Sequence, residues 1–389
     1  MKKRIVHVVS NPSVSGVTAV IRFLLLGMQE KGWSVYLVHY GKNDDFCEML
    51  SRDGVKIFKI KTPPRWIQPL RTYWIISEIK KLFLSISPTL VHAHSFDVDL
   101  LSVRASMGSH FPIMVTCHSF SYVDWVKHEL RQYQRWDQRI AKYVCVCKLL
   151  EKQLSEIHPL SRDRLKTIYN APDIHFFRKI LTAEREECRS KLGILPNEIA
   201  ITCVATYHPA KGQEVLAEAF VRLVKNHNVK LFLVGSEGHI YGGNSIKQKV
   251  SDILTSAGVM ERCRMIVDCT DARPVLAASD IYVQPSHQEG LSVALGEALA
   301  CALPAVVTSA GGNPEIVLDG QNGFVVPPAD PEKMAMAIEK LVINESMRRR
   351  MGDYSKQIAE ENLHPSIIIK SYSGLYDELL QLDFFHKSK

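Results

Sequence analysis

Short runs of aliphatic and β-branched residues alternate along the chain with longer segments whose apolar residues recur every three or four positions. In the first half, the short runs fall at 5–9, 34–39, 90–93 and 113–116, and a helical pattern starting at residue 17 ends at Gly32. A strand, a helix and a second strand in this order predict right-handed βαβ units and therefore a parallel sheet.

The same alternation restarts in the second half of the chain. Strands are expected at 199–205, 229–234, 265–267, 281–284, 305–308 and 323–326. Helices are expected at 212–226, 246–256, 274–278, 292–301, 331–343, 346–361 and 365–382. A segment rich in Glu and Arg, 182–197, predicts a helix and a turn between the two halves. We therefore expect two α/β domains, because 389 residues exceed what one hydrophobic core usually organises.

Composition favours an ordered protein of a reducing compartment. Apolar residues make up 46% of the chain, and the apolar run at the N-terminus stops at Asn11, too soon for a signal peptide. No stretch approaches the roughly 18 uninterrupted apolar residues of a membrane helix. The nine cysteines lie in predicted strands and helices, and Cys145 and Cys147 are expected to be buried thiols rather than metal ligands. We expect a cytoplasmic protein without a bound metal.

Charge is divided unevenly between the halves. Residues 1–182 contain 27 lysines and arginines against 15 aspartates and glutamates, whereas the rest of the chain has an acidic excess. In two places basic residues are interleaved with aromatic ones. These are Arg65, Trp66, Arg71, Tyr73, Trp74, Lys80 and Lys81, and then Arg131, Tyr133, Arg135, Trp136, Arg139 and Lys142 at helical spacing. The pattern is typical of a helix lying on a membrane surface, and equally of a solvated helix that packs its aromatic residues inward. No nucleic-acid recognition module accompanies the charge.

The clearest candidate for chemistry is the stretch 286–298, in which Glu289 and Glu297 are eight positions apart. A strand ending at Pro285 leads into a loop, Gly290 allows close backbone approach, and a helix beginning near Ser292 offers exposed N–H groups to an anion. Glu297 then lies roughly 7–8 Å along the helix, about the distance from a diphosphate to its ribose. Taken alone, the pair also fits an ordinary acidic helix start.

The register of further residues extends this motif, and here the chain resembles glycosyltransferase family 4. The shared positions are Pro285-Ser286, Glu289-Gly290, Glu297-Ala298, Pro304, Gly311-Gly312, Pro314-Glu315, Asp319-Gly320, Asn322-Gly323 and Pro327. The resemblance covers nearly the whole chain and is most specific over 281–330. It implies the α/β GT-B fold, in which two Rossmann-like domains with parallel sheets face a central cleft. Domain 1–182 would bind the acceptor, domain 183–364 the nucleotide sugar, and the helix over 365–389 would return to the first domain.

The family's donor-site residues can be carried over to matching positions. Glu289, Gly290, Leu291, Ser292 and Glu297 match the donor-site motif itself. Gly16 matches the glycine-rich first loop, where Ser15 replaces a frequent glycine. Gly235 and Glu237 match the loop near the nucleotide. His118 matches a histidine placed beside the transferred sugar, although a histidine after a strand is more often structural. Asn170 and Asp173 match a turn and are expected to be structural.

One departure from the family stands at the predicted diphosphate site. Lys211 and Gly212 are retained, but Thr206 occupies the position of the usual arginine. Loss of a bidentate guanidinium removes about 1–3 kcal/mol of leaving-group stabilisation, unless another cation such as His208 or Arg273 compensates. Asp268 also lies near a position where the family usually has a glycine. Asp97-Val98-Asp99 looks like a metal-diphosphate motif of another fold and is expected to be a coincidence.

The resemblance implies a retaining hexosyltransferase that assembles cell-surface polysaccharide or glycolipid. Its donor would be a nucleoside diphosphate sugar, UDP-sugar more than GDP-sugar, and its acceptor a hydroxyl of a glycan or lipid-linked glycan. His118, Glu289 and Lys211 would be catalytic, with Thr206 at the donor site. No cofactor or nucleic-acid partner is expected. The basic first domain is expected to contact the inner face of the cell membrane peripherally.

Other functions compatible with the pattern are a non-catalytic nucleotide-sugar-binding homologue, a sugar-nucleotide epimerase and a phosphorylase. A Rossmann oxidoreductase is disfavoured, because no Gly-x-Gly-x-x-Gly follows the first strand.

Overall fold

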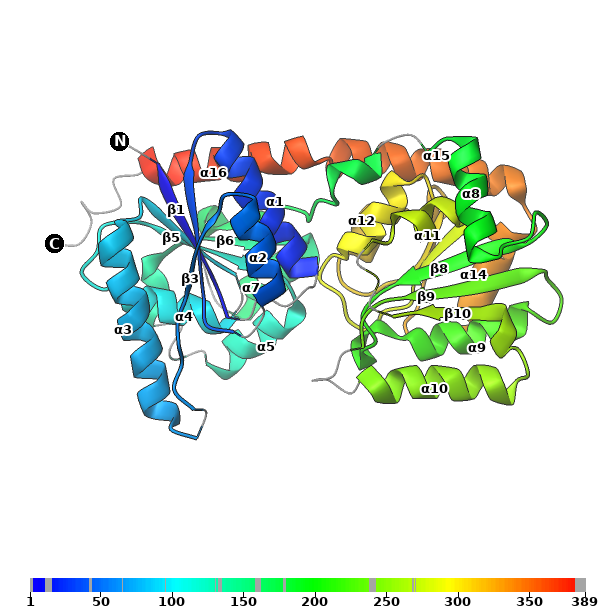
Figure 1. The fold of residues 1–389 in the computed structure, drawn as a ribbon, viewed down its shortest axis with the longest axis horizontal. Coiled ribbons are helices and arrows are strands. Elements are labelled where there is room, and N and C mark those ends of the chain that lie inside the picture. The colour runs from blue at the N-terminus through cyan, green and yellow to red at the C-terminus, as the bar shows by residue number, and fades with distance from the viewer. Residues whose placement is uncertain are drawn as a thin grey trace. The chain divides into compact units, whose positions relative to one another are not determined.

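The computed structural model describes residues 3–10, 16–41, 44–64, 66–94, 96–129, 131, 135–157, 162–177, 180–237, 243–267, 269 and 271–381. The chain forms two compact units (Figure 1). Unit 1 comprises residues 1–169 and 366–389, and unit 2 comprises residues 170–365. The first boundary therefore falls between Tyr169 and Asn170, rather than between 182 and 183 as the sequence suggested.

Unit 1 contains a seven-stranded parallel sheet with the order β3-β2-β1-β4-β5-β6-β7. Its strands are β1 (Arg4–Val9), β2 (Ser34–His39), β3 (Lys56–Lys59), β4 (Leu90–His94), β5 (Ile113–Cys117), β6 (Ile140–Cys145) and β7 (Leu165–Thr167). Its helices are α1 (Gly16–Glu30), α2 (Asp44–Arg52), α3 (Gln68–Ile86), α4 (Phe96–Ala105), α5 (Phe120–His128), α7 (Lys148–Ile157) and α16 (Pro365–Gln381). The strand order reverses between β1 and β4. Open α/β sheets bind ligands outside the carboxyl ends of their strands at such a switch point.

Both faces of this sheet are covered by helices, so its central strands are buried along their length. On one face, α3, α4, α5 and α7 pack side by side in that order. On the other face, α16 lies against β4, where the Tyr376 hydroxyl is 2.8 Å from His92 Nδ1, and against α1, where Ile369 fills the space beside Gly27. The last helix of the chain is therefore part of unit 1, far in sequence from the strands that it covers.

Unit 2 contains a six-stranded parallel sheet with the order β10-β9-β8-β11-β12-β13, whose switch point lies between β8 and β11. Its strands are β8 (Ile199–Val204), β9 (Val229–Val234), β10 (Cys263–Ile266), β11 (Ile281–Gln284), β12 (Ala305–Thr308) and β13 (Gly323–Val326). Its helices are α8 (Thr182–Leu192), α9 (Gln213–Leu223), α10 (Gly243–Ser256), α11 (Arg273–Ala278), α12 (Val293–Ala300), α13 (Asn313–Ile316), α14 (Pro331–Val342) and α15 (Glu345–Asn362). Helices α9, α10 and α14 pack together on one face, and α8 packs on α11 (Figure 1).

The helix α8 belongs to unit 2 and does not lie between two domains, as its charged sequence had suggested. Arg185 and Arg189 both bind the Asp280 carboxylate, at 2.7 and 2.9 Å, and donate to backbone carbonyls around residue 278. Two guanidinium groups sharing one carboxylate hold the helix on the sheet although none of its residues is buried. The Glu and Arg content of 182–192 therefore reflects docking through charge rather than a linker.

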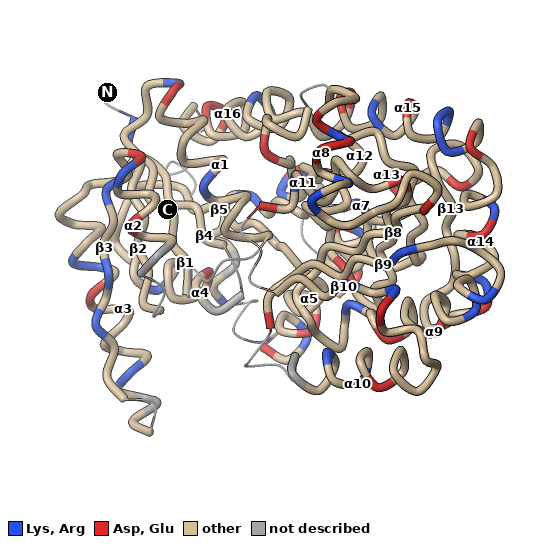
Figure 2. The backbone as a smooth tube through the Cα atoms, turned by 45° about the vertical axis from the view of Figure 1, so that its right-hand side comes forward, with Lys and Arg blue, Asp and Glu red and all other residues tan. Residues whose placement is uncertain are grey.

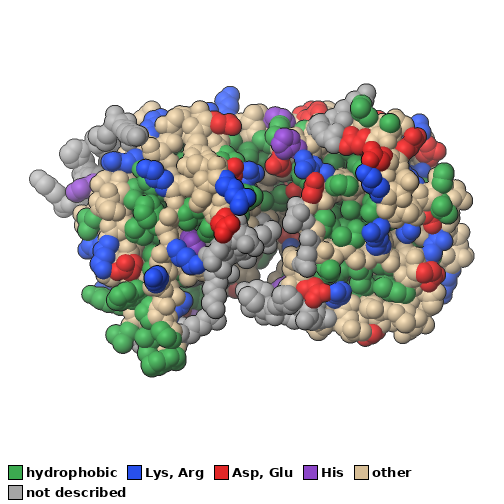
Figure 3. All heavy atoms as spheres, viewed as in Figure 1, with side chains coloured by type: hydrophobic (Ala, Val, Ile, Leu, Met, Phe, Trp, Pro, Cys, Tyr) green, Lys and Arg blue, Asp and Glu red, His purple; other side chains and the backbone are tan. Residues whose placement is uncertain are grey.

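The two basic and aromatic segments of unit 1 have different structures. The described residues of the first lie at the end of the loop before α3 and along α3 as far as Lys81. Basic residues recur along α3 (Figure 2), and hydrophobic side chains gather at its lower end (Figure 3). The predicted single helical face over 131–142 is wrong, because Arg139 ends a 3-10 turn (Asp137–Arg139) and Lys142 lies on β6. Arg139 donates to the Ser109 carbonyl at 3.1 Å. Strand pairing with β5 overrides the helical spacing there. Arg65 and Tyr133 lie outside the described residues.

None of the nine cysteines, all of them among the described residues, forms a disulfide bond, and Cys145 and Cys147 are both buried. Strand β6 ends at Cys145, so Cys147 begins the turn into α7 instead of continuing the strand. Among the helices of the described residues, none combines the length and the apolar content needed to cross a bilayer.

Candidate active site

Two loops meet at the switch point of unit 2, one after β8 and one after β11. The backbone N–H groups of His287 and Gln288 donate to the Ala210 carbonyl at 2.8 and 3.2 Å. The His287 ring also bonds Glu214 at 3.0 Å. These contacts join the segment with Thr206 and Lys211 to the segment with Glu289 at the carboxyl edge of the sheet. The structure thus brings together predicted residues that are far apart in sequence.

Lys211 and Glu289 form an ion pair at this edge. Lys211 Nζ lies 3.0 and 2.8 Å from the two carboxylate oxygens of Glu289. The side chain of Glu289 is 9% exposed, whereas that of Lys211 is 27% exposed. The amine is therefore the partner that a ligand from solvent could reach and bind, with the carboxylate beneath it.

A chain of buried polar groups supports Glu289 from below. The Tyr282 hydroxyl donates to Gln284 Oε1 at 2.7 Å, Gln284 Nε2 donates to Ser286 Oγ at 2.8 Å, and Ser286 Oγ donates to Glu289 at 3.1 Å. Tyr282, Gln284 and Ser286 are fully buried. Such a network restricts the carboxylate to one position, as a positioning group for a sugar requires.

Glycines allow the backbones of the loops of the site to pass one another in direct contact. Gly212 has φ +65°, and a Cβ at this residue would lie 2.1 Å from the Pro285 carbonyl oxygen. Gly311 has φ +57°, and its Cβ would lie 1.7 Å from the Glu289 carbonyl oxygen. The neighbouring Gly312 N–H donates to the Gly290 carbonyl at 2.8 Å. Both positions therefore require glycine for conformation and for space.

The loop after β11 leads into α12 through Leu291 and Ser292. Ser292 caps the helix, its hydroxyl accepting from Leu295 N–H at 3.3 Å. Asn170, buried in the same unit, donates to the Leu291 carbonyl at 2.8 Å. Asp173 closes a turn by accepting from His175 N–H at 2.9 Å. Asn170 therefore holds the loop before α12, and Asp173 has a local structural role.

Glu297 lies in the second turn of α12. No described residue forms a hydrogen bond or an ion pair with its carboxylate. Burial raises the pKa of Glu297 from 4.5 to about 7, with smaller contributions from Asp173 and Asp271, while Arg273 lowers it. A half-buried carboxylate without a partner is costly unless a ligand supplies donors. Ribose hydroxyl groups would do so.

The stability of unit 2 should therefore depend on pH through Glu297. Its pKa is higher in the folded than in the unfolded chain, so folding favours the protonated form. The free energy of unfolding falls as the pH rises from 4.5 to about 7, and above pH 7 the ionised carboxyl costs up to about 3 kcal/mol. Glu297→Gln should match the natural protein at pH 4.5 and exceed it by up to that amount at pH 8, measured by urea denaturation. Glu345→Gln, at an exposed ion pair, controls for loss of a charge; an equal gain in both variants would contradict the prediction.

At the position where the family usually has an arginine, the hydroxyl groups of Thr206 and Ser236 lie next to each other. Thr206 Oγ1 lies 3.3 Å from Ser236 Oγ, and the Thr206 carbonyl accepts from Gln213 at 2.9 Å. His208 does not replace the cation, because its Nδ1 accepts from Ala210 N–H at 3.0 Å and burial, with Lys211, lowers its pKa. Arg273 is held by Asp271 at 2.8 and 2.9 Å. Asp268 lies outside the described residues.

The loop after β9 carries Gly235 and Glu237. Gly235 N–H donates to the Ile266 carbonyl at 3.0 Å, and the Glu237 carboxylate pairs with Lys247 of α10. The backbone of Glu237 also forms an isolated parallel β-bridge with Tyr207 on the neighbouring loop. Both residues thus lie at the same edge of the sheet as Lys211.

In unit 1, Gly16 begins α1 and His118 follows β5, so both lie at the carboxyl edge near the switch point between β1 and β4. Ser15 lies outside the described residues. Asp99 is buried and accepts from the Tyr122 hydroxyl at 2.5 Å, which is a structural role; nothing is described of the Asp97 side chain.

Sequence reasoning missed a cluster of buried histidines behind His118. His7 Nδ1 lies 2.8 Å from His94 Nε2, and His94 Nδ1 lies 3.1 Å from His118 Nε2. His92 bonds Thr116 at 2.7 Å. Burial lowers the pKa of His7 to about 3 and that of His118 to about 4, and lowers those of His92 and His94 as well, so the rings are neutral at pH 7. The alternation His92-Ala93-His94 in an apolar strand was the available signal.

Nitrogens of His7, His92 and His94 lie within 4.8 Å of one another, close enough to hold a metal ion. However, both nitrogens of His92 are within hydrogen-bond distance of hydroxyl groups, and His7 and His94 bond each other. Hydrogen bonds therefore account for the arrangement without an ion.

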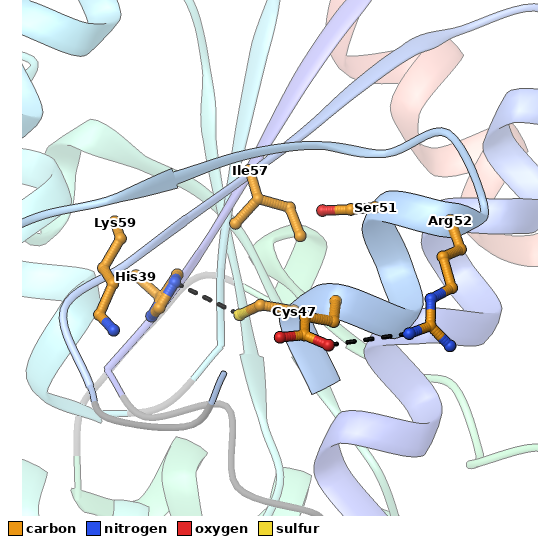
Figure 4. A pocket seen from close by; sticks show the side chains of 7 residues that line it. His39, Cys47, Ser51, Arg52, Ile57 and Lys59 are labelled. Carbon is orange, nitrogen blue, oxygen red and sulfur yellow. Dashed lines mark hydrogen bonds and ion pairs between the residues drawn. The ribbon is translucent and has the colours of Figure 1, made fainter. Parts of the chain in front are cut away.

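Two of the cavities lined by described residues of unit 1 contain no predicted site residue. The first, about 310 Å³, is lined by His39, Cys47, Glu48, Ser51, Arg52, Ile57 and Lys59 (Figure 4). There Cys47 Sγ lies 3.3 Å from His39 Nε2. The second, about 360 Å³, is lined by Arg104, Arg131, Arg135 and Trp136, near the amino ends of β5 and β6. The predicted residues instead lie in loops and in the first turns of helices at the carboxyl edges of the two sheets.

Two Rossmann-like units with polar loops at both switch points define an α/β protein of the GT-B class. Over residues 184–358 the chain matches the family model for glycosyl transferases group 1, and over 14–176 that for glycosyltransferase family 4. The chain belongs to this glycosyltransferase family, and the predicted family and fold class are confirmed.

Known proteins similar to the chain include the spore coat protein SA of Bacillus subtilis, 28% identical over 61% of this chain and 65% of that protein. An Escherichia coli UDP-Gal:alpha-D-GlcNAc-diphosphoundecaprenol alpha-1,3-galactosyltransferase is 25% identical over 87% of this chain and 88% of that protein. The structure of Anabaena HepE, solved in complex with UDP and glucose, is similar to this chain with a TM-score of 0.85 and 17% sequence identity. The match covers 97% of this chain and 100% of the HepE chain. The match to the spore coat protein spans less than two thirds of its length.

Proposed function

We propose that the protein transfers a hexose-type sugar from a nucleoside diphosphate sugar to an acceptor hydroxyl, with retention at the anomeric carbon. The observation that carries the proposal is the grouping in unit 2 of Lys211 paired with Glu289, the start of α12 at Ser292, and Glu297 without a partner one to two turns later. A cation and helix N–H groups suit a diphosphate, and a carboxylate at that distance suits a ribose.

In the proposed reaction, the bond between the anomeric carbon and the diphosphate oxygen breaks and a bond to the acceptor oxygen forms. Lys211 and the Ser292 helix start stabilise the negative charge that develops on the diphosphate. A diphosphate oxygen takes the acceptor proton. Glu297 holds the ribose and Glu289 orients the sugar. The assignment of Gly16 and His118 of unit 1 to the diphosphate and the sugar, respectively, stays a prediction from the family resemblance.

The nature of the donor is inferred from similar proteins. The name of the E. coli galactosyltransferase includes UDP-Gal, and Anabaena HepE was solved with UDP and glucose, so a UDP-sugar is favoured over a GDP-sugar. The same E. coli name includes a diphosphoundecaprenol-linked sugar, in keeping with a glycan or lipid-linked acceptor in the assembly of a surface polysaccharide. The proposal needs no metal, since Lys211 and the helix start supply the positive charge.

Native mass spectrometry with UDP- and GDP-sugars should reveal a complex with at least one UDP-sugar. Incubation of that donor with glycan acceptors should then yield a product whose anomeric configuration, determined by NMR, matches the donor, with or without EDTA. A product formed without acceptor would indicate an epimerase. Absence of binding to every sugar nucleotide would contradict the proposal.

Substitution of Glu297 and substitution of Glu289 should impair different properties of the protein, donor affinity and turnover, respectively. Glu297→Ala removes the acceptor of ribose hydroxyl groups, so donor affinity should fall by about 10–100-fold. Glu289→Ala should lower kcat by about 100-fold and change donor affinity much less, because its role is confined to the sugar. Calorimetric titration and initial rates measure the two effects. Glu345→Ala is the control for an exposed carboxylate, and equal effects in the two site variants would contradict the assignment.

A protein that binds nucleotide sugars without catalysis is the second candidate, because Thr206 replaces the usual arginine and neither His208 nor Arg273 provides a free cation in its place. Under this alternative the donor binds in calorimetry but is neither transferred nor hydrolysed, and Thr206→Arg does not raise turnover. Under the proposed function, Thr206→Arg raises kcat.

A further inference from the structure

One cavity of unit 1 is lined by arginines and an aromatic ring, with no acidic side chain among its described lining residues. Arg104, Arg131, Arg135 and Trp136 surround a space of about 360 Å³. Arg104 lies in the last turn of α4, whereas the other three residues precede the 3-10 turn that leads into β6. Two separate segments of the chain therefore direct guanidinium groups toward one space.

The three guanidinium groups have no anionic partner in the described part of the chain. No ion pair and no hydrogen bond from Arg104, Arg131 or Arg135 to a described residue is found. On α8, by contrast, two neighbouring arginines share the carboxylate of Asp280. Arg131 and Arg135 are four positions apart, a spacing at which like charges on a helical segment repel each other. The cavity therefore gathers positive charge that an anion from solution could neutralise.

Trp136 holds one of the three guanidinium groups in place. The Arg135 Cζ atom lies over the Trp136 ring, 4.9 Å from its centre. Attraction between the cation and the ring face stabilises this position, and the guanidinium N–H groups remain available as donors. Because Arg135 is already restrained, it loses less conformational freedom when it binds a ligand. The cavity is thus partly preorganised for an anion.

The cavity lies at the edge of the sheet opposite to Gly16 and His118. Helix α4 follows the carboxyl end of β4 and returns to the amino edge, so that Arg104 in its last turn lies near the start of β5. Residues 131–136 directly precede the 3-10 turn and the start of β6, at the same amino edge. Gly16 and His118 follow the carboxyl ends of β1 and β5. A ligand in the cavity would therefore occupy a site separate from the one predicted at the carboxyl edge.

The lining of the cavity indicates the class of its ligand. A guanidinium group offers pairs of N–H donors whose spacing matches two oxygens of a phosphate or diphosphate. Several positive charges without an acidic neighbour favour an anion with more than one negative charge over a single carboxylate. The volume of about 360 Å³ is near the lower end of the range for small-molecule pockets, roughly 300–1,000 Å³. A compact phosphorylated molecule therefore fits better than an extended polymer.

We propose that the cavity formed by Arg104, Arg131, Arg135 and Trp136 is a binding site for a small, soluble phosphate ester or diphosphate. The three guanidinium groups donate hydrogen bonds to the phosphate oxygens, and Trp136 positions Arg135 for this contact. The ligand is bound and not converted, because the cavity lining holds no nucleophile, general base or acid. The site is independent of the residues assigned to sugar transfer.

Inorganic pyrophosphate is the probe that tests the site, and the indole of Trp136 is the reporter. In ¹H–¹⁵N spectra of the full chain, the indole signal of Trp136, assigned through Trp136→Phe, should shift on titration with pyrophosphate. The signal of Trp33, which is buried beside β2, should stay in place. Sodium chloride at the same ionic strength should not reproduce the shift, and inorganic phosphate should bind at least tenfold more weakly than pyrophosphate.

Substitutions of the arginines assign the binding to this cavity. Arg104→Gln and Arg135→Gln should each weaken pyrophosphate binding by about 10–100-fold, since each removes charged hydrogen bonds to phosphate. Arg104→Lys keeps the charge but loses the paired donors, so its loss should be smaller. Arg349→Gln, at an exposed ion pair of unit 2, is the control for loss of an arginine and should bind like the natural chain. Lys211→Met should leave the Trp136 shift unchanged as well, because Lys211 belongs to the other predicted site.

Four results would overturn the proposal. The first is absence of a Trp136 shift at millimolar pyrophosphate, and the second is an equal shift with sodium chloride. The third is binding that Arg104→Gln and Arg135→Gln leave unaltered, since pyrophosphate would then bind elsewhere. The fourth is flotation with phosphatidic acid vesicles, or binding of a single-stranded RNA more tightly than pyrophosphate, that depends on the same arginines, because the ligand would then be a lipid headgroup or a nucleic acid. Circular dichroism verifies that each variant is folded.

The outcome for this cavity is distinguishable from the outcome for sugar transfer. The indole shift does not depend on turnover, so a chain that binds pyrophosphate through Arg104 and Arg135 but transfers no sugar would contradict only the proposed function. A chain that transfers sugar and shows no Trp136 shift would contradict only the phosphate site.

Discussion

Lys211→Met should lower the rate of sugar transfer by about 100- to 1000-fold. The variant removes the cation assigned to the departing diphosphate, and electrostatic groups of this kind commonly contribute that much to kcat. It also leaves the Glu289 carboxylate, 9% exposed, without its charged partner at 2.8 Å. Removing one member of a largely buried pair destabilises a protein by up to about 3 kcal/mol, so the denaturation midpoint should fall as well. Initial rates with the identified donor and urea denaturation measure the two effects.

A second substitution separates catalysis from stability. In Lys211→Met/Glu289→Gln the buried negative charge is also removed, so stability should return while turnover stays low. Lys191→Met, which breaks an exposed ion pair with Glu187 on α8, controls for the loss of a lysine and should retain full activity. Full turnover in Lys211→Met would contradict the assignment of Lys211 to the diphosphate.

Gly311→Ala should be the most destabilising single substitution among those considered. The residue has φ +57°, and the new Cβ would lie 1.7 Å from the Glu289 carbonyl oxygen and 2.9 Å from that of Gly290. The left-handed conformation costs alanine about 1–2 kcal/mol, and forcing two backbone segments apart adds about 1–3 kcal/mol. We therefore expect a loss of about 2–5 kcal/mol, together with weaker donor binding, because the displaced segment carries Glu289.

Gly320→Ala provides the comparison for Gly311→Ala. Gly320 has φ +75° but nothing within 4 Å of its would-be Cβ, so the variant should lose only the conformational term, about 1–2 kcal/mol. Urea denaturation followed by circular dichroism reports on unit 2; the five tryptophans all lie in unit 1, so their fluorescence does not. Equal losses in the two variants would show that backbone conformation alone, and not the close approach, makes Gly311 necessary.

Much of the fold could be predicted because it depends on local pattern. The strands at 199–205, 229–234 and 305–308 and the helix at 331–343 are continuous apolar or amphipathic segments, and the structure has them within one or two residues. Parallel strands buried on both faces must be apolar throughout, which makes them easy to recognise. The family motif over 281–330 was recognisable for a related reason, since its glycines and prolines mark turns at fixed spacing.

The errors fall where distant residues decide the outcome. The charged segment 182–192 was interpreted as a connection, but Asp280, almost a hundred residues later, docks it on unit 2. The helical spacing of Arg131, Arg135 and Arg139 suggested one helix, and pairing of β6 with β5 ends it. In both cases a long-range interaction outweighs a local preference.

For the candidate site, the residue types and their order were available in the sequence, and their partners were not. Glu289, Glu297, Lys211 and Gly311 were all recognised from motif and spacing. The bonding of Lys211 to Glu289, the isolation of the Glu297 carboxylate and the burial that raises its pKa depend on chain segments that meet only at the sheet edge. The same holds for His7 on β1, His94 on β4 and His118, which follows β5. Local pattern depends on neighbours within a few residues and is therefore contained in the sequence, whereas hydrogen-bond partners, burial and protonation depend on which distant segments become adjacent, and tertiary structure alone determines that.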